Sequence, residues 1–414
     1  MVYMAGKWLT YPGGPNHQAP LVVILFVLIL ILSSCNPRTE QIPYSDSAVD
    51  SAIKKKLILV DTLRIEVDSV TQVNHYFTQV KYLSSDTLYL IFNTNIMALQ
   101  AYSLTTQQLV WQQQYPTSGP GEVDINSRFF YHNKDSVFFF TEYPYNSLKL
   151  FNNKGELRHS WVIRLPEPYS DFWVSLTMFG EFSYQANSVV FAVYPEISPS
   201  ATTRFYQQGR LCSYNLRTNE YRFFARFPEL FYATDALYYV FEYIEFYVRS
   251  GHLVTHFHPT GELSTYSLPD LKLKRKVYAP SWFIKKNTKP FMYRGEDEPD
   301  AQQENNYLMT EPYYAMMTAN PEGTLHYRIV KLRTLLRYED GTLRNFYDKP
   351  FSIMVLDSVF NIVDEVKFSG GLYDYYQVFA VADRLYISYN NPMNEANSES
   401  FMQFAVFKLT DIKP

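Results

Sequence analysis

The chain has 414 residues, with 37 lysines and arginines against 41 aspartates and glutamates, so its formal net charge at pH 7 is −4. Binding of nucleic acid needs a basic face that neutralises phosphates, and this balance argues against nucleic acid as a partner. Aromatic residues make up 17% of the chain and there are only 15 glycines, a composition that favours pleated strands.

The first predicted element is a signal peptide over residues 1–34. An unbroken apolar run from Leu21 to Leu32 is too short to cross a bilayer as a helix and matches the apolar region of a secretory signal. Ser33, Ser34 and Cys35 follow, and an apolar residue, two small residues and a cysteine resemble the bacterial lipoprotein signal. The resemblance implies cleavage before Cys35 and a lipid on its thiol, so a membrane is the first expected partner.

Residues 35–56 are predicted to be a flexible tether, because they are rich in Ser, Asp, Pro and Gln. Asn36, directly after the cysteine, is not an inner-membrane retention signal of the familiar kind. We therefore expect a lipoprotein of the cell envelope, in the outer membrane, with its leaflet left open. Cys212 is the other cysteine, so no intramolecular disulfide is expected, and its position within a predicted strand is typical of a buried, inert thiol.

Residues 57–414 are predicted to form one all-β domain. The clearest unit begins at Ser85 and contains three short strands, over 87–92, 96–102 and 108–115, separated by polar turns. The same order of turn and strand returns over 135–163, 187–227, 250–278, 323–368 and 383–409.

Copies of roughly 50 to 60 residues, each a meander of three or four strands, are typical of a β-propeller. Six blades fit the spacing best, and a seventh would need an unrecognised copy within 229–248 or 283–320. The last copy lacks a strand while Lys56 to Val67 is unassigned, so we predict that this N-terminal strand pairs into the last blade and closes the ring. The alternative fold is a pair of β-sandwiches.

The loop from Tyr115 to Glu122 reads YPTSGPGE. It resembles the Gly-Pro-Gly-Glu loop of six-bladed propeller lipoproteins from Gram-negative, gut-type bacteria, and the whole chain is similar in layout to uncharacterised lipoproteins of about this length from the same bacteria. The resemblance implies the fold and the compartment and leaves the function open. The glycines and prolines of the loop suit a tight turn, and the alternative is that the turn presents Glu122 and Asp124 to a ligand at the propeller mouth.

His252, His256 and His258 share one face of a predicted strand. Along a strand they span roughly 20 Å, so only His256 and His258 are near enough to share a metal ion. The favoured interpretation is that they are polar residues of a half-exposed strand, and no metal or other cofactor is expected.

Two further segments have alternative interpretations. Acidic residues crowd Glu296 to Asp300, but without the alternating ligands of a calcium loop, which favours a solvated loop. The most aromatic stretch is 231–248, and its rings are suited either to stacking on a glycan or, as we favour, to packing between blades.

No linear motif identifies catalytic residues, because the chain has no Gly-x-Ser-x-Gly, Ser-x-x-Lys or His-Glu-x-x-His. The first hypothesis is a binding or scaffold module for a protein or glycan ligand, and the alternative is a glycan hydrolase or lyase with carboxylates gathered at the axial mouth. A third is a purely structural component of the envelope. An enzyme predicts two or more carboxylates with a His or Tyr in one deep axial pocket, whereas a binding module predicts a shallow aromatic or apolar patch.

Overall fold

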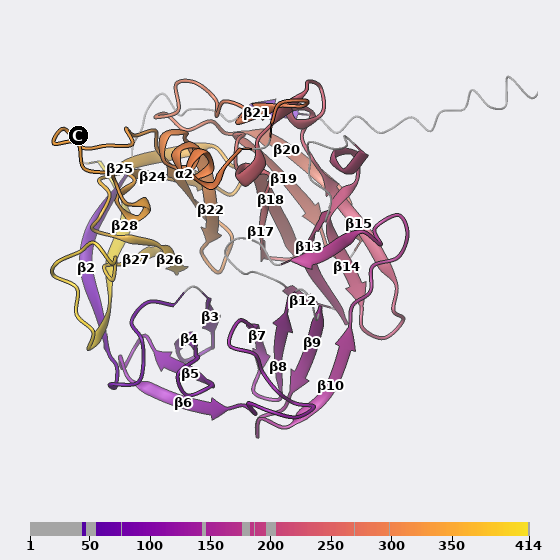
Figure 1. Ribbon diagram of the computed structural model, residues 1–414. Coiled ribbons are helices and arrows are strands. Elements are labelled where there is room, and N and C mark those ends of the chain that lie inside the picture. Colours follow the sequence, from indigo (N-terminus) through magenta and orange to yellow (C-terminus); the bar gives the residue numbers. More distant parts are fainter. Residues whose placement is uncertain are drawn as a thin grey trace, which may run out of the picture. The chain divides into compact units, whose positions relative to one another are not determined.

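The structure, a computed structural model, describes residues 44–46, 55–75, 77–142, 146–175, 183–185, 187–195, 204–268, 270–297 and 299–412. The expected signal peptide and Cys35 lie outside these residues. In the part that the structure describes, the strands form six blades of a β-propeller (Figure 1). The predicted all-β, six-bladed fold is therefore confirmed.

In blades one, two, four and five the strands form an antiparallel meander that starts next to the central axis and proceeds towards the periphery (Figure 1). The first two blades are β3 (Thr78–Tyr82), β4 (Thr87–Asn93), β5 (Ala98–Ser103), β6 (Leu109–Gln114), then β7 (Arg128–Asn133), β8 (Ser136–Thr141), β9 (Ser147–Phe151), β10 (Leu157–Val162). The third blade has five strands, which are β11 (Phe172–Ser175), β12 (Ser183–Gln185), β13 (Ser188–Pro195), β14 (Gly209–Asn215), β15 (Tyr221–Arg226). The fourth and fifth are β17 (Ile244–Arg249), β18 (His252–Phe257), β19 (Glu262–Ser267), β20 (Leu273–Tyr278), then β22 (Tyr313–Ala319), β23 (Leu325–Lys331), β24 (Phe351–Asp357), β25 (Ile362–Phe368).

The sixth blade combines the two ends of the propeller. It contains β26 (Asp374–Val381), β27 (Arg384–Ser388), β28 (Phe401–Asp411) and, as its outer strand, β2 (Lys55–Glu66). The pairing of β2 with β28 is antiparallel along its whole length, from Lys55 opposite Asp411 to Glu66 opposite Phe401. The backbone N–H of Leu57 in β2 also donates to Asp364 Oδ2 in β25 at 2.7 Å, which joins the fifth blade to the sixth.

The middle strands of a blade are apolar because neighbouring blades cover both of their faces. In blade one, all six residues of β5 are buried, whereas β6 at the periphery is exposed or half-buried throughout. The rings of Phe92 and Phe139 meet at 5.0 Å between centroids, so the middle strands of blades one and two pack face to face. Burial of such surface, at about 25 cal/mol per Å², is the main source of stability in a chain without a disulfide among its described residues.

The two intervals considered for a seventh blade hold insertions instead. The first contributes β16 (Ala236–Leu237) and the second β21 (Met292–Tyr293), and these pair with each other as a two-stranded sheet. The second interval also contains helix α2 (Ala301–Thr310), whose N-terminus is capped by the Asp300 side chain. No helix among the described residues has the length and apolar composition to cross a bilayer.

Short elements complete the described part. The segment β1 (Tyr44–Asp46) pairs in parallel with β20. The 3-10 turns are η1 (Arg204–Gln207), η2 (Glu229–Phe231), η3 (Tyr239–Phe241), η4 (Phe346–Asp348). The aromatic stretch 231–248 runs through η2, β16, η3 and β17, and its large side chains are mostly buried, which is consistent with packing between blades.

Buried charged side chains link blades four and five. The Arg328 guanidinium of β23 is inaccessible to solvent and donates to the backbone oxygens of Thr260 at 2.9 Å and Gly261 at 3.1 Å. It also lies 3.8 Å from the centre of the Tyr314 ring. The Glu365 carboxylate of β25 is likewise buried and accepts bonds from Ser352 within its own blade and from the loop after β20.

Candidate functional site

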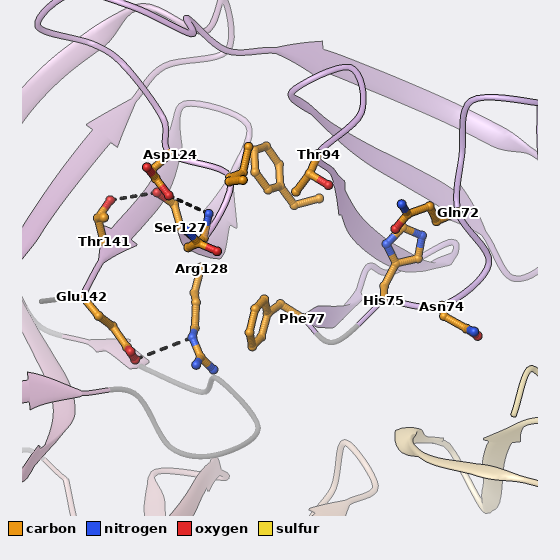
Figure 2. A pocket seen from close by; sticks show the side chains of 13 residues that line it. Gln72, Asn74, His75, Phe77, Thr94, Asp124, Ser127, Arg128, Thr141 and Glu142 are labelled. Atoms are coloured by element: carbon orange, nitrogen blue, oxygen red, sulfur yellow. Dashed lines mark hydrogen bonds and ion pairs between the residues drawn. The ribbon is translucent and has the colours of Figure 1, made fainter. Parts of the chain in front are cut away.

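A cavity of about 680 Å³ lies where blades one and two meet. It is built from the loops that lead into the inner strands β3 and β7 and from the ends of β4 and β8 (Figure 2). Its volume falls within the range of about 300 to 1,000 Å³ that is usual for small-molecule sites. The residues that line it are Gln72, Asn74, His75, Phe77, Phe92, Thr94, Asp124, Ile125, Asn126, Ser127, Arg128, Thr141 and Glu142.

One side of the cavity carries buried polar atoms that lack a partner. His75 is 8% exposed, and burial lowers the pKa of its imidazole to about 4, so the ring is neutral at pH 7. Among the described residues, no hydrogen-bond partner reaches His75 Nε2 or Asn74 Oδ1, although both atoms are buried. A buried polar atom without a partner costs about 1 to 3 kcal/mol, and one way to recover this cost is a bond from a ligand.

The opposite side carries a charged pair beside an aromatic ring. Arg128 Nε lies 3.6 Å from Glu142 Oε1, and the Arg128 guanidinium lies 4.0 Å from the centre of the Phe77 ring (Figure 2). Burial lowers the pKa of Arg128, while Glu142 and, from blade four, Glu245 oppose this effect. Arg128 is the first residue of β7, the inner strand of blade two, so this side of the cavity lies next to the propeller axis (Figure 1).

The Gly-Pro-Gly-Glu loop brings Asp124, but not Glu122, to the cavity wall. Asp124 Oδ1 accepts the backbone N–H of Asn126 at 2.8 Å and its backbone oxygen accepts from Ser127, so the carboxylate also shapes the turn. The Glu122 backbone instead bonds to Gly119, which has a positive φ of 80° that glycine adopts without strain. The loop therefore forms a tight turn and also places one carboxylate, that of Asp124, at the cavity wall.

His256 and His258 lie together at the end of β18, but they are fully buried rather than half-exposed. Their ring centroids are 6.3 Å apart, and His258 Nε2 lies 3.5 Å from Glu245 Oε1. Burial, and next the positive charge of Arg328, lower the pKa of both imidazoles, and a nearby cation also opposes the binding of a metal ion. Across the part of the chain that the structure describes, no three His, Cys, Asp or Glu side chains form a metal site.

The other residues singled out in the sequence have structural roles. The Cys212 thiol is inaccessible, and burial raises its pKa. In the acidic segment, the Glu296 side chain accepts the backbone N–H of Tyr293, and Asp300 caps helix α2. These contacts account for both carboxylates without a bound cation.

The cavity holds two carboxylates and a histidine, the set of side chains that was expected of an enzyme, but these side chains do not converge on one point (Figure 2). Two carboxylates line it, but Asp124 is held by its own turn and Glu142 is paired with Arg128. His75 lies across the cavity from them, with Phe77 between (Figure 2). Polar atoms around an aromatic ring are the usual means of orienting a ligand in a site of this kind.

Most of these cavity residues were not found from the sequence. The segment from Gln72 to Phe77 follows no motif, and Arg128 at the start of β7 and Glu142 directly after β8 are 14 positions apart and meet only when these strands pair. The one residue that the sequence pointed to is Asp124, through the turn that precedes it.

Comparisons with known proteins agree with this architecture. Residues 54–367 match a family model described as "Domain of unknown function (DUF4221)". The crystal structure of a DUF4221 family member from Bacteroides vulgatus is similar with a TM-score of 0.70 and 18% identity, over 87% of this chain and 99% of that one. A putative exported protein from Bacteroides fragilis has a TM-score of 0.48 and 11% identity, over 89% of this chain and 99% of that one.

No curated protein matches the sequence. The likeness to the Bacteroides vulgatus structure supports the propeller fold alone, because the identity is low. The family model extends over more than half of the chain, from the strand β2 to the end of the fifth blade. The chain therefore belongs to the DUF4221 family.

Proposed function

We propose that this protein is a lipid-anchored β-propeller of the cell envelope that binds a glycan in the cavity between blades one and two. The anchoring part of the proposal is supported by the apolar run and the Leu-Ser-Ser-Cys sequence that ends at Cys35. The binding part is supported by the cavity. Its single most telling feature is a pair of buried atoms, His75 Nε2 and Asn74 Oδ1, for which the described residues supply no hydrogen-bond partner.

The chemistry of these atoms favours a ligand rich in hydroxyl groups. Asn74 Oδ1 is an acceptor and needs a donor, while a neutral imidazole nitrogen is a donor or an acceptor according to its tautomer. A hydroxyl group serves both, because it donates one hydrogen bond and accepts others. Phe77, beside these residues, supplies an apolar ring of the kind that packs against the face of a sugar.

The test is glycan-array binding followed by titration of the best-bound glycan. The protein would be the chain from residue 35 onward with Cys35→Ser, which removes the lipid and keeps every described residue. The variant His75→Phe keeps a ring of similar size and removes both nitrogens. Loss of one neutral hydrogen bond predicts a rise in Kd of about 2- to 12-fold.

The matched control is His252→Phe, an exposed histidine at the start of β18 that does not line the cavity. We expect this variant to bind as the parent does, and thermal unfolding would verify that both variants are folded. A Kd that is unchanged in His75→Phe, or equally changed in the control, would contradict binding at this cavity.

The alternative is a glycan hydrolase or lyase, and the observation in its favour is that Asp124 and Glu142 both line the cavity. The same titrations distinguish the two functions, because an enzyme releases cleaved product from the bound glycan over time. Product formation that is lost in Glu142→Gln would favour the enzyme. Stable binding without product favours the binding module.

A further inference from the structure

Positive charge is concentrated in one segment of an otherwise acidic chain. Between Leu271 and Pro290 the sequence contains seven lysines and arginines and no aspartate or glutamate, whereas the whole chain has a net charge of −4. The seven residues are Lys272, Lys274, Arg275, Lys276, Lys285, Lys286 and Lys289.

The fold places these cations on the periphery of blade four. The first four belong to or directly precede β20, the outermost strand of the blade apart from the three-residue β1, and the last three belong to the loop that follows it. The Tyr278 hydroxyl donates to Asn287 Oδ1 at 3.5 Å, so the loop lies against the end of the strand. Lys272, Lys274, Lys285, Lys286 and Lys289 are exposed, while Lys276 is partly neutralised by Glu262 at 3.2 Å.

The same loop exposes an aromatic side chain that lies, in the sequence, between the two groups of cations. Phe283 is 41% exposed and precedes Lys285 by two positions. The base of the loop is fixed, because the Ser281 hydroxyl and the Trp282 backbone N–H both donate to the buried Glu365 carboxylate, at 2.5 and 2.6 Å. The loop therefore holds Phe283 and its neighbouring lysines outward on a rigid support. We call these residues, with Lys272 and Lys274, the basic patch.

We infer that the basic patch docks on an anionic lipid membrane, through phosphate-bearing headgroups. Lysines bind such headgroups as point charges with few geometric demands, and an aromatic ring enters the boundary between headgroups and acyl chains. Lysine stems also follow the apolar surface while their ammonium groups stay in the polar layer. This contact is separate from the glycan cavity and does not depend on the lipid of Cys35.

An acidic protein segment is the competing occupant, and the structure favours the membrane over it. An extended segment would add to the free backbone edge of β20, but β1 already pairs with this edge opposite Lys276, Val277 and Tyr278. The remaining cations are divided between a strand and a loop, with an exposed ring among them. Such a surface matches a broad anionic plane better than a single extended chain.

The test is sedimentation with vesicles of phosphatidylcholine alone and of phosphatidylcholine mixed with phosphatidylglycerol. The protein is again the chain from residue 35 with Cys35→Ser, so that binding does not come from the lipid anchor. We expect binding to the anionic vesicles alone, and its loss at high salt because exposed charges are screened. Each lysine near an anionic surface strengthens binding roughly five-fold, so the double variant Lys285→Glu/Lys286→Glu should weaken it about thirty-fold or more.

The charge-matched control is Lys134→Glu/Lys154→Glu, two exposed lysines in turns of blade two. A second readout is the fluorescence of the variant Phe283→Trp. The emission maximum of the added tryptophan should shift to shorter wavelength on anionic vesicles if this side chain enters the bilayer. The inference is overturned if anionic vesicles do not bind the protein, if both double variants bind alike, or if poly-glutamate binds the basic patch while vesicles do not. Retained glycan binding in Lys285→Glu/Lys286→Glu would show that the two surfaces are independent.

Discussion

The buried Arg328 provides a direct test of what holds neighbouring blades together. Its guanidinium, which is inaccessible to solvent, reaches across from blade five to the backbone oxygens of Thr260 and Gly261 in blade four, and more distantly to Ala279 at 3.5 Å. It also stacks on Tyr314. The perturbation that we consider is Arg328→Met, which keeps a long apolar stem and removes the charge and all donors.

The expected magnitude follows from opposing contributions. Two hydrogen bonds from a charged donor contribute about 1.5 to 3 kcal/mol each, and the stacking on Tyr314 contributes about 1 kcal/mol. Against them stands the cost of burying the charge, which lowers the pKa of Arg328 from 12.5 to about 10 and corresponds to about 3 kcal/mol. The balance predicts that Arg328→Met lowers the free energy of unfolding by about 1 to 4 kcal/mol.

The assay is equilibrium unfolding in urea, monitored by intrinsic fluorescence, with the midpoint and the slope m fitted separately. A lower midpoint at unchanged m would indicate lost stability without a change in the surface exposed on unfolding. The control is Arg158→Met, an exposed arginine on the outer strand β10, and we expect it to be within about 0.5 kcal/mol of the parent. If Arg328→Met proves as stable as the parent or more so, burial of the charge outweighs its bonds and the reasoning is wrong.

Two further predictions concern the anchor and the response to acid. Metabolic labelling of the full chain with an alkyne fatty acid should mark the parent and Cys212→Ser but not Cys35→Ala, and label retained in the last variant would contradict lipidation there. His326 bonds to the Tyr247 hydroxyl at 2.6 Å, and burial lowers its pKa from 6.5 to about 4, so the unfolded chain binds this proton at a higher pH than the folded one. Stability from this residue is therefore complete above about pH 7 and falls as the pH decreases from about 6.5 to 4, by about 2 kcal/mol between pH 7 and 5. The stability difference between the parent and His326→Gln, measured in urea at both pH values, should decrease by this amount, and a constant difference would contradict the assignment.

The strands that are buried on both faces could be predicted, because burial gives them a recognisable apolar sequence. Strands such as β4 and β5 are covered on both faces, so they appear as short apolar segments between polar turns. The inner strand β3 was missed, because it is half-buried at every position and carries Gln79 and Lys81 among its five residues. Lys81 donates to the backbone oxygen of His132 in the neighbouring inner strand β7, and such a polar contact does not produce an alternating pattern.

The candidate site was less predictable for a related reason. Its residues come from four separate loops and strand ends, and they form a cavity only once blades one and two are packed together. His256 and His258 illustrate the opposite case. Their pattern was recognised in the sequence, but the burial of their side chains was not predicted. The sequence placed them on one strand face, and only the structure shows that this face is buried beside Arg328.

The pairing of β2 with β28 has a consequence for the order in which the molecule folds. The Thr410 hydroxyl donates to the backbone oxygen of Lys56, a contact between residues 354 positions apart in the chain. Such distant contacts slow folding, because the entropy of a very long loop is lost before the contact forms. During synthesis β2 emerges before β3 to β27 and its ladder partner β28 emerges after them, so β2 stays unpaired through most of translation. Until β28 is complete, the unpaired edge of β2 is therefore a site where aggregation competes with folding.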